Sequence, residues 1–153
     1  MIKGKNKITI IVNGRFHAFD YAAELHKLGC LDKLISTMPY YKAKSYGISK
    51  EHYIGFPILE AFKIIYRKIF KKELPVNFYA KLFTLLAKLF IPKDTDVIIA
   101  FAGYSKEIFN DKKYFNKIKI LDRGSTHTLA NIELKTHAAN YHNALYQSHP
   151  KTF

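Results

Sequence analysis

A β-branched run near the start of the chain constrains the fold more than any other feature of the sequence. Ile8–Val12 ends at Asn13-Gly14 and is typical of a strand that is buried on both faces. Residues 19–28 follow helical spacing and stop at Gly29, and a second strand fits 33–37. A strand, a loop, a helix and a second strand within about 30 residues form a βαβ unit.

The later part of the chain repeats this alternation. We expect strands over 96–101 and 118–121, a short helix over 105–109 and a longer helix over 126–145. Strands that alternate with helices predict an α/β fold with a Rossmann-like, open and mostly parallel sheet that carries helices on both faces. The length of 153 residues fits a single domain over 1–153.

The middle of the chain breaks the alternation. Residues 40–55 have no period and are interpreted as irregular, whereas 59–72 and 76–91 are expected to be two helices separated by Pro75. We interpret 59–91 as a basic helical insertion. In its second helix the polar side chains are expected to line one narrow stripe, formed by Asn77, Lys81, Thr84 and Lys88.

The chain is strongly basic. Its 25 Lys and Arg residues against 12 Asp and Glu residues give a net charge of +13, and most of the excess lies in residues 1–93, which favours an anionic partner. Lys63, Arg67 and Lys71 recur every four residues and form a stripe on the first helix of the insertion. Such a stripe is typical of a solvated helix face or of a helix that binds an anionic membrane surface. Nucleic acid is not expected as a partner, because no recognised motif supports it.

Cysteine usage and hydropathy bear on the compartment. The single cysteine, Cys30, cannot form an internal disulfide, which suits a reducing cytoplasm. No apolar run reaches the length of about 20 residues that spans a bilayer, and Ile8–Val12 is too short for the core of a signal peptide. We therefore expect a cytoplasmic protein, with a peripheral position on the inner face of the membrane as the second option.

Three glycine-containing loops follow predicted strands, at 13–17, 102–105 and 122–127. The carboxyl ends of parallel strands share one edge, so residues from these loops should converge where α/β sheets bind ligands. Glycine lets the backbone approach a ligand and a helix start attracts an anion, although a turn alone also explains each glycine. The candidate residues for binding a phosphate or another ligand at this edge are Gly14, Arg15, His17, Gly103, Tyr104, Ser105, Arg123, Gly124 and Ser125.

Two titratable residues in the last loop are the catalytic candidates. His127 starts a helix at the expected ligand edge, where it can donate to a sugar hydroxyl or steady a reacting centre. Asp122 is the candidate acid or base beside it. The alternatives are a capping role for His127 and a local ion pair between Asp122 and Arg123.

Several common sites are excluded by spacing. The histidines in the last part of the chain lack metal-site spacing and no cysteine pair accompanies them, so no metal is expected. No Gly-x-Gly-x-x-Gly, Walker or Gly-x-Ser-x-Gly motif is present, which argues against the usual dinucleotide, NTPase and hydrolase sites. We expect no cofactor.

The loops together carry a family resemblance. Gly-Arg-Phe-His at 14–17 within 11–25, Phe-Ala-Gly-Tyr-Ser at 101–105 and Leu-Asp-Arg-Gly-Ser-Thr-His at 121–127 resemble the N-terminal half of glycosyltransferase family 4 proteins with the GT-B fold. The resemblance implies one of two Rossmann-like domains, the one that receives the acceptor. It also implies metal-free, retaining transfer from a nucleotide sugar to a glycan or lipid-linked acceptor, with Gly14 facing the donor diphosphate and His127 beside the transferred sugar.

The resemblance also bears on partners. Basic amphipathic helices bind such domains to membranes. The resemblance therefore favours an anionic membrane surface as the partner that Lys63, Arg67 and Lys71 bind. The donor-binding motifs of the family belong to a C-terminal domain that the 153 residues do not include, so we expect a truncated N-terminal domain that is inactive alone. The alternative function is a non-enzymatic α/β module that binds a membrane surface or another anion.

Overall fold

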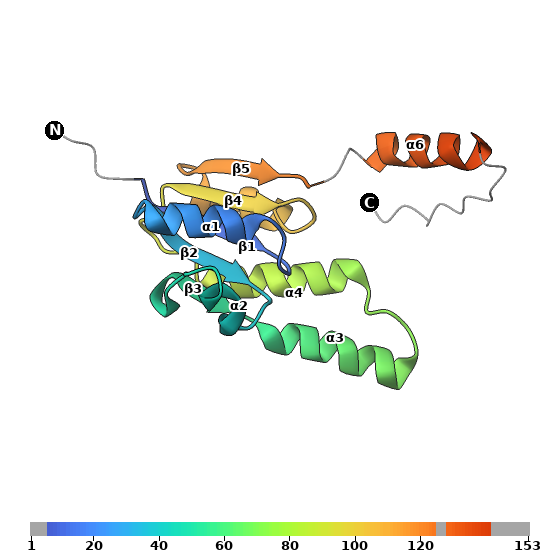
Figure 1. Ribbon diagram of the computed structural model, residues 1–153, viewed down its shortest axis with the longest axis horizontal. Coiled ribbons are helices and arrows are strands. Elements are labelled where there is room, and N and C mark those ends of the chain that lie inside the picture. Colours follow the sequence, from blue (N-terminus) through green and yellow to red (C-terminus); the bar gives the residue numbers. More distant parts are fainter. Residues whose placement is uncertain (1–5, 125–127, 142–153) are drawn as a thin grey trace. The chain divides into compact units, whose positions relative to one another are not determined.

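The computed structural model describes residues 6–124 and 128–141 and divides the chain into two compact units, 1–122 and 123–153 (Figure 1). The first unit holds a sheet of five parallel strands in the order β3-β2-β1-β4-β5. The strands are β1 (Ile8–Val12), β2 (Leu31–Ser36), β3 (Tyr53–Gly55), β4 (Val97–Phe101) and β5 (Ile118–Asp122). The predicted Rossmann-like α/β class, with helices flanking an open parallel sheet, is confirmed.

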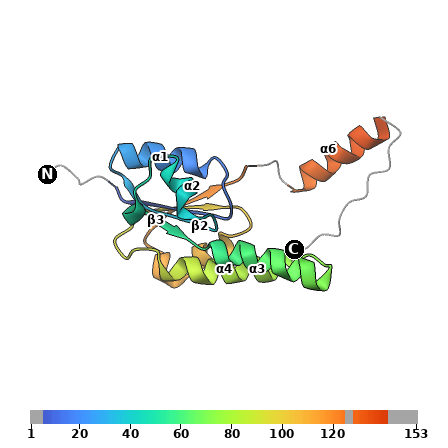
Figure 2. The same ribbon diagram turned by 60° about the horizontal axis from the view of Figure 1, so that its bottom comes forward.

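Helices cover both faces of this sheet. Helices α1 (Ala18–Lys27) and α2 (Tyr40–Lys44) lie on one face, and α3 (Pro57–Phe70), α4 (Val76–Leu89) and α5 (Lys106–Phe109) belong to the other, as Figure 2 shows for α1, α3 and α4. Short 3-10 turns, η1 (Lys50–His52) and η2 (Lys112–Tyr114), precede β3 and β5. The second unit contains α6 (Thr128–Tyr141).

The central strand β1 explains the two cores. Ile10 and Val12 are fully buried in the cluster under α1 and α2, whereas Ile11 is fully buried in the cluster under α4. Successive side chains of a strand point to opposite faces, so an unbroken apolar run is what a strand covered on both sides needs. The predicted double burial of this strand is confirmed.

Buried hydrogen bonds connect residues near the amino-terminal ends of β1, β2 and β4. The fully buried hydroxyls of Thr9 and Thr95 are 2.8 Å apart, and Thr95 Oγ1 also donates to Asp32 Oδ2 at 2.6 Å. A buried hydroxyl without a partner costs about 1 to 3 kcal/mol, so these mutual bonds allow threonine inside the sheet.

The interpretation of 40–55 as irregular is wrong. This segment forms α2, η1 and the edge strand β3, because Ala43, Ile48 and Tyr53 bury their side chains in the core beside α1. These three buried residues are five positions apart, which matches neither the period of 3.6 residues of a helix nor the period of two of a strand. Tertiary burial therefore decides the local structure here, and periodicity does not.

Helix α3 is weakly anchored. It begins at Pro57, in the first turn where proline needs no N–H partner, and ends at Phe70, two residues before the predicted end at 72. Leu59 is its single buried residue, with 5% of its surface exposed, whereas Ile69 is 67% exposed. The apolar side chains that α3 leaves exposed are Ile58, Phe62, Ile64, Ile65, Ile69 and Phe70.

The predicted polar stripe of α4 is only partly exposed to solvent. Thr84 is fully buried and donates to the Ala80 carbonyl at 2.8 Å, and the half-buried Lys88 pairs with Asp111. Half of the polar stripe therefore faces the protein. The large apolar side chains that α4 exposes are Val76, Phe78, Leu85 and Leu89.

Strand β5 forms one edge of the sheet and leaves Ile118, Ile120 and Leu121 exposed. Within residues 6–124 and 128–141, no helix combines the length and the apolar content needed to cross a bilayer.

Candidate functional site

The loops after β1 and β4 and the end of β5 meet at the carboxyl edge of the sheet. Asn13 Nδ2 donates to the Tyr104 hydroxyl at 2.5 Å, which joins the first two loops. His17 Nε2 lies 3.0 Å from Asp122 Oδ2, which joins the first loop to the end of β5. The structure thus brings together residues that are about a hundred positions apart in sequence, because β1, β4 and β5 are neighbouring parallel strands.

Gly14 shapes the first loop. Its φ of 84° lies in the left-handed region that favours glycine. Its N–H donates to Thr37 Oγ1 at 3.0 Å and its carbonyl accepts from Ser36 Oγ at 2.8 Å, so the loop is fastened to the end of β2. The Gly14 amide is therefore occupied by Thr37 and differs from the open amide expected at a phosphate loop.

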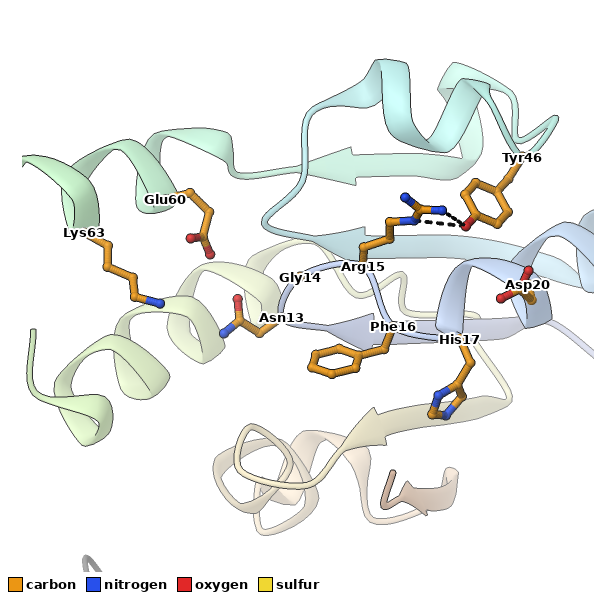
Figure 3. Close-up of a pocket in the computed structure, with 9 residues that line it drawn as sticks. All are labelled: Asn13, Gly14, Arg15, Phe16, His17, Asp20, Tyr46, Glu60 and Lys63. Carbon is orange, nitrogen blue, oxygen red and sulfur yellow. Dashed lines mark hydrogen bonds between the residues drawn. The ribbon is translucent and has the colours of Figure 1, made fainter. Parts of the chain in front are cut away.

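The loop forms one wall of an open pocket of about 700 Å³ (Figure 3). Residues that follow β1 supply most of the lining, and α3 contributes Glu60 and Lys63 from the opposite side. A volume of this size is in the range of small-molecule sites. The lining residues are Asn13, Gly14, Arg15, Phe16, His17, Asp20, Tyr46, Glu60 and Lys63.

His17 and Asp122 form a partly buried pair beside aromatic rings. The His17 ring lies 5.1 Å from the Phe101 ring and 5.0 Å from the Tyr21 ring, measured between centroids. Burial, followed by the negative charge of Asp122, raises the pKa of the Tyr21 hydroxyl. When the imidazole is neutral and donates from Nε2 to Asp122, its Nδ1 keeps a lone pair that can accept a proton.

The two cations of the pocket are held by tyrosines. Arg15 donates to the Tyr46 hydroxyl from Nε at 3.0 Å and from Nη2 at 2.8 Å. Lys63 Nζ lies 5.6 Å from the centroid of the Tyr79 ring. Arg15 was predicted as a binding residue, whereas Lys63 was assigned to a membrane-facing stripe and lies at the pocket.

A polar network under the pocket was missed by the sequence analysis. The Tyr79 hydroxyl donates to Glu60 Oε1 at 2.5 Å, and Thr37 Oγ1 lies 3.0 Å from Asn13 Oδ1 and 3.1 Å from Glu60 Oε1. Burial, with the Glu60 carboxylate as the next cause, raises the pKa of Tyr79 strongly, so this hydroxyl remains a donor. Only Glu60 carried a signal in the sequence, an acidic residue in the first turn of a helix.

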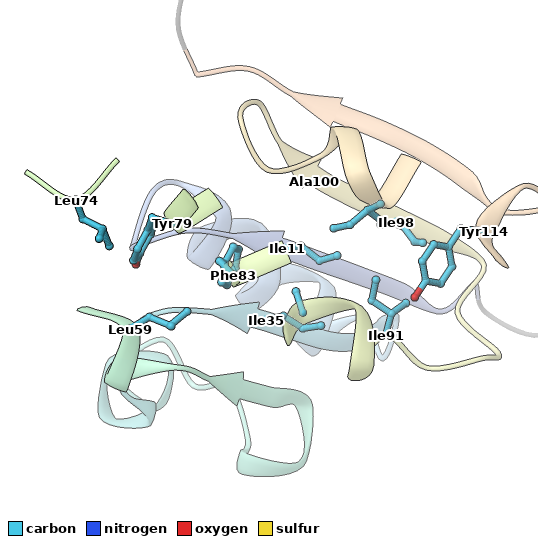
Figure 4. Packing of buried hydrophobic residues seen from close by; sticks show 12 residues of the cluster. Ile11, Ile35, Leu59, Leu74, Tyr79, Phe83, Ile91, Ile98, Ala100 and Tyr114 are labelled. Atoms are coloured by element: carbon cyan, nitrogen blue, oxygen red, sulfur yellow. The ribbon is translucent and has the colours of Figure 1, made fainter. Parts of the chain in front are cut away.

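The same network rests on the apolar core. Tyr79 is 4% exposed and belongs to the cluster that also contains Leu59, Leu74 and Phe83, which Figure 4 shows between the helices and the sheet. Residues in the first turns of α3 and α4 therefore pack in the core and also form the network under the pocket. This packing fixes Glu60 and Tyr79 relative to the loop after β1.

The remaining predicted site residues have different surroundings. Gly103 has a φ of 94° and open space around it, whereas Ser105 is buried at the start of the four-residue helix α5. Arg123 and Gly124 follow β5 and begin the second unit. Ser125 and His127 lie outside the described residues, as does Thr126 between them.

The predicted basic stripe does not continue along α3. Arg67 Nη1 lies 3.6 Å from Glu73 Oε1, and Lys71 follows the end of the helix with a φ of 51°. Across residues 6–124 and 128–141, no three His, Cys, Asp or Glu side chains are grouped as metal ligands.

Comparison with known proteins leaves the chain without a family assignment. No protein-family model matches the sequence, and a search of curated proteins gives no match either.

Proposed function

We propose that this chain is the acceptor-side domain of a GT-B glycosyltransferase, which transfers a sugar from a nucleotide-sugar donor to a glycan or lipid-linked acceptor when a donor-binding domain accompanies it. The observation that carries the proposal is the pocket at the carboxyl edge of the open α/β sheet. Ligands of such sheets bind at this edge. The motif resemblance at 14–17, 101–105 and 121–127 supports the same assignment.

The chemistry of the pocket supports a ligand that contains a sugar. Glu60, Asp20 and Asn13 offer carboxylate and amide groups to hydroxyls, and the cations Arg15 and Lys63 offer charge to a phosphate. Phe16 adds an apolar surface at the same opening. This combination suits a polar, hydroxyl-rich molecule better than an apolar one.

His17 is the proton-handling residue of the proposal, and Asp122 is its positioning residue. The 3.0 Å contact between them fixes the orientation of the imidazole ring. His17 then accepts a proton from an acceptor hydroxyl or holds that hydroxyl by a hydrogen bond. The proposal keeps His127 as a second candidate contact to the transferred sugar.

A binding experiment tests this function. The ¹⁵N-labelled chain is titrated with UDP-, GDP- and ADP-sugars and with glycan acceptors, and we expect amide shifts in 13–17 and 60–63. His17→Ala should weaken the shifts, while Lys93→Gln, which is remote from the pocket, serves as the matched control. Shifts confined to other parts of the chain, or shifts that survive His17→Ala and Arg15→Gln, would contradict the assignment.

A second candidate function is adsorption to an anionic membrane surface through α3 and α4. The observation that favours it is the exposed apolar surface of α3, described above, which lies beside Arg67, Lys68 and Lys71. Apolar side chains flanked by Lys and Arg are what an interfacial helix presents to lipid, and each basic residue contributes about 1 kcal/mol near an anionic leaflet.

Vesicle cosedimentation tests the membrane function. Wild-type chain should pellet with phosphatidylglycerol vesicles, and binding should fall as salt rises because the charges are screened within about 8 Å at physiological ionic strength. Replacing Arg67, Lys68 and Lys71 with Glu should abolish binding, whereas Lys112→Glu with Lys117→Glu, outside the helix, should not. Equal binding of all variants would exclude this surface.

A further inference from the structure

Glu60 presents half of its carboxylate to the pocket. Oε1 accepts from Tyr79 at 2.5 Å and lies 3.1 Å from the Thr37 hydroxyl, whereas Oε2 has no hydrogen-bond partner in the described parts of the chain. The half-buried Glu60 side chain lines the pocket (Figure 3). One oxygen therefore holds the carboxylate in place, and the other remains able to accept a hydrogen bond from a ligand.

The protons of the network can be assigned one by one. Tyr79 has a single hydroxyl proton and the shorter of its two contacts is to Glu60, at 2.5 Å against 3.3 Å to Asn13 Oδ1. Thr37 then donates to Asn13 and accepts from the Gly14 amide. Neither of these two hydroxyls donates to Glu60 Oε2, so this oxygen can accept a hydrogen bond from a ligand.

The positive and negative groups of the pocket do not neutralise each other. Among the described residues, Lys63 and Glu60 form no ion pair although they are one helical turn apart, because Lys63 lies over the Tyr79 ring and Glu60 accepts from the Tyr79 hydroxyl. Arg15 is held by Tyr46 in the same way. Tyrosines thus keep two cations and a carboxylate apart around one opening.

We infer that the ligand of this pocket is a polyol that carries an anionic group, with hydroxyls donating to Glu60 Oε2 and the anion lying between Arg15 and Lys63. A neutral sugar would leave the two cations without a partner, and a simple anion would be repelled by Glu60 and would leave its free oxygen unused. The inference rests on the proposed function only in identifying this polyol with the acceptor. A sugar phosphate and a sugar carboxylate have the required chemistry in common.

Calorimetric titration of the full chain tests the inference with four probes: glucose, inorganic phosphate, glucose 6-phosphate and glucuronate. A molecule that engages both kinds of group should bind about tenfold or more tightly than glucose or phosphate alone. The tighter of glucose 6-phosphate and glucuronate identifies the anionic group. Equal affinity for glucose and for both charged sugars would overturn the inference.

Two variants test separately what the Glu60 carboxylate and the Lys63 cation contribute to binding. Glu60→Gln keeps the shape of the side chain but removes its charge, so the sugar phosphate should lose about tenfold in affinity while inorganic phosphate binds as well or better. Lys63→Gln should reduce the preference for charged sugars over glucose and leave the affinity for glucose unchanged. Lys81→Gln, an exposed lysine of α4 outside the pocket lining, is the matched control.

The outcomes separate this inference from the proposed function. Circular dichroism checks that Glu60→Gln is folded, and Lys63→Gln tests the charge preference if it is not. Binding of a charged sugar without any transfer in the presence of a donor-binding domain would contradict glycosyl transfer and leave the inference in place. Transfer to a neutral acceptor that is unaffected by Glu60→Gln and Lys63→Gln would overturn the inference alone.

Discussion

Two glycines at the carboxyl edge of the sheet are required for different physical reasons. Gly14 has a left-handed φ but an added Cβ would meet only a Phe16 ring atom at 3.7 Å, whereas a Cβ on Gly55 would lie 2.5 Å from the Met38 carbonyl oxygen. We expect Gly14→Ala to cost about 1 to 2 kcal/mol from backbone strain alone. Gly55→Ala should destabilise the fold more, because a backbone atom must move.

Urea unfolding followed by circular dichroism measures both costs. Gly103→Ala, at a φ of 94° with nothing within 4 Å, is the control for strain without crowding and should resemble Gly14→Ala. If Gly55→Ala lowered the free energy of unfolding less than Gly14→Ala does, crowding at Gly55 would not be the larger cost.

The buried threonine pair gives a prediction on polar burial. Thr95→Val removes the partner of Thr9 inside the sheet and should cost about 1 to 3 kcal/mol, since the remaining hydroxyl stays buried without a bond. Thr9→Val combined with Thr95→Val should recover part of this loss, because no buried Thr9 hydroxyl remains. Denaturant unfolding of the two single variants and the double variant tests the coupling; strictly additive losses would speak against it.

Tyr53 predicts how stability depends on alkaline pH. Burial raises the pKa of its hydroxyl to about 12, from 10.0 for an ordinary tyrosine, and the hydroxyl donates to the Met38 carbonyl. Between pH 10 and pH 12 the unfolded chain loses this proton while the folded chain keeps it, so stability falls as pH rises, and Tyr53 contributes about 2 to 3 kcal/mol to the loss.

Thermal unfolding between pH 9 and pH 12 measures this loss. Tyr53→Phe should flatten the decline, whereas Tyr41→Phe, at a largely exposed side chain, should leave it unchanged. An unaltered slope in Tyr53→Phe would show that other groups cause the loss.

At the scale of elements, α3 buries a single residue, Leu59. Leu59→Ala removes its buried anchor and should cost about 2 to 4 kcal/mol. Ile65→Ala and Ile69→Ala, on the exposed side, should change the free energy of unfolding by about 0.5 kcal/mol or less. Chemical denaturation distinguishes the two classes, and comparable losses at all three positions would mean that the outer side of α3 is packed in solution.

The elements differ in how well the sequence predicts them. Strand β1 is predictable because burial on both faces requires an unbroken apolar run. Helix α1 is predictable because burial on one face leaves a helical period of apolar residues. Strand β3 is not, since only Tyr53 in its three residues is buried. Glu60 and Tyr79 escaped detection because their meeting depends on how α3 and α4 pack, which residue spacing within either helix does not encode.

For the whole molecule, we predict that the isolated chain of 153 residues will bind a ligand but will not transfer a sugar. In the proposed function the reaction takes place between two domains, and without the groups of a donor-binding domain most of a proximity advantage of about 7 to 11 kcal/mol is missing. The purified chain is incubated with UDP-, GDP- and ADP-sugars and with acceptors, alone and with a donor-binding domain added. Robust transfer by the chain alone would contradict the prediction.

The sequence predicts the class of the fold, but it does not predict on which surface each charged side chain lies. The recurrence of Lys63, Arg67 and Lys71 every four residues predicts a continuous basic stripe on α3. In the structure Lys63 lies at the pocket, Arg67 pairs with Glu73 and Lys71 follows the helix. Which way a lysine extends depends on the neighbouring tyrosine, and that neighbour comes from another element.

The strand order β3-β2-β1-β4-β5 has a consequence for how the chain acquires its structure. Strands β1, β2 and β3 follow one another along the chain, so this half can assemble early, even on the ribosome. Strand β4 pairs Val97 with Ile8, and closing that loop of about 90 residues carries an entropic cost that delays the step. Until then the apolar edge of β1 is unpaired, and the nascent chain is most vulnerable to aggregation during that interval.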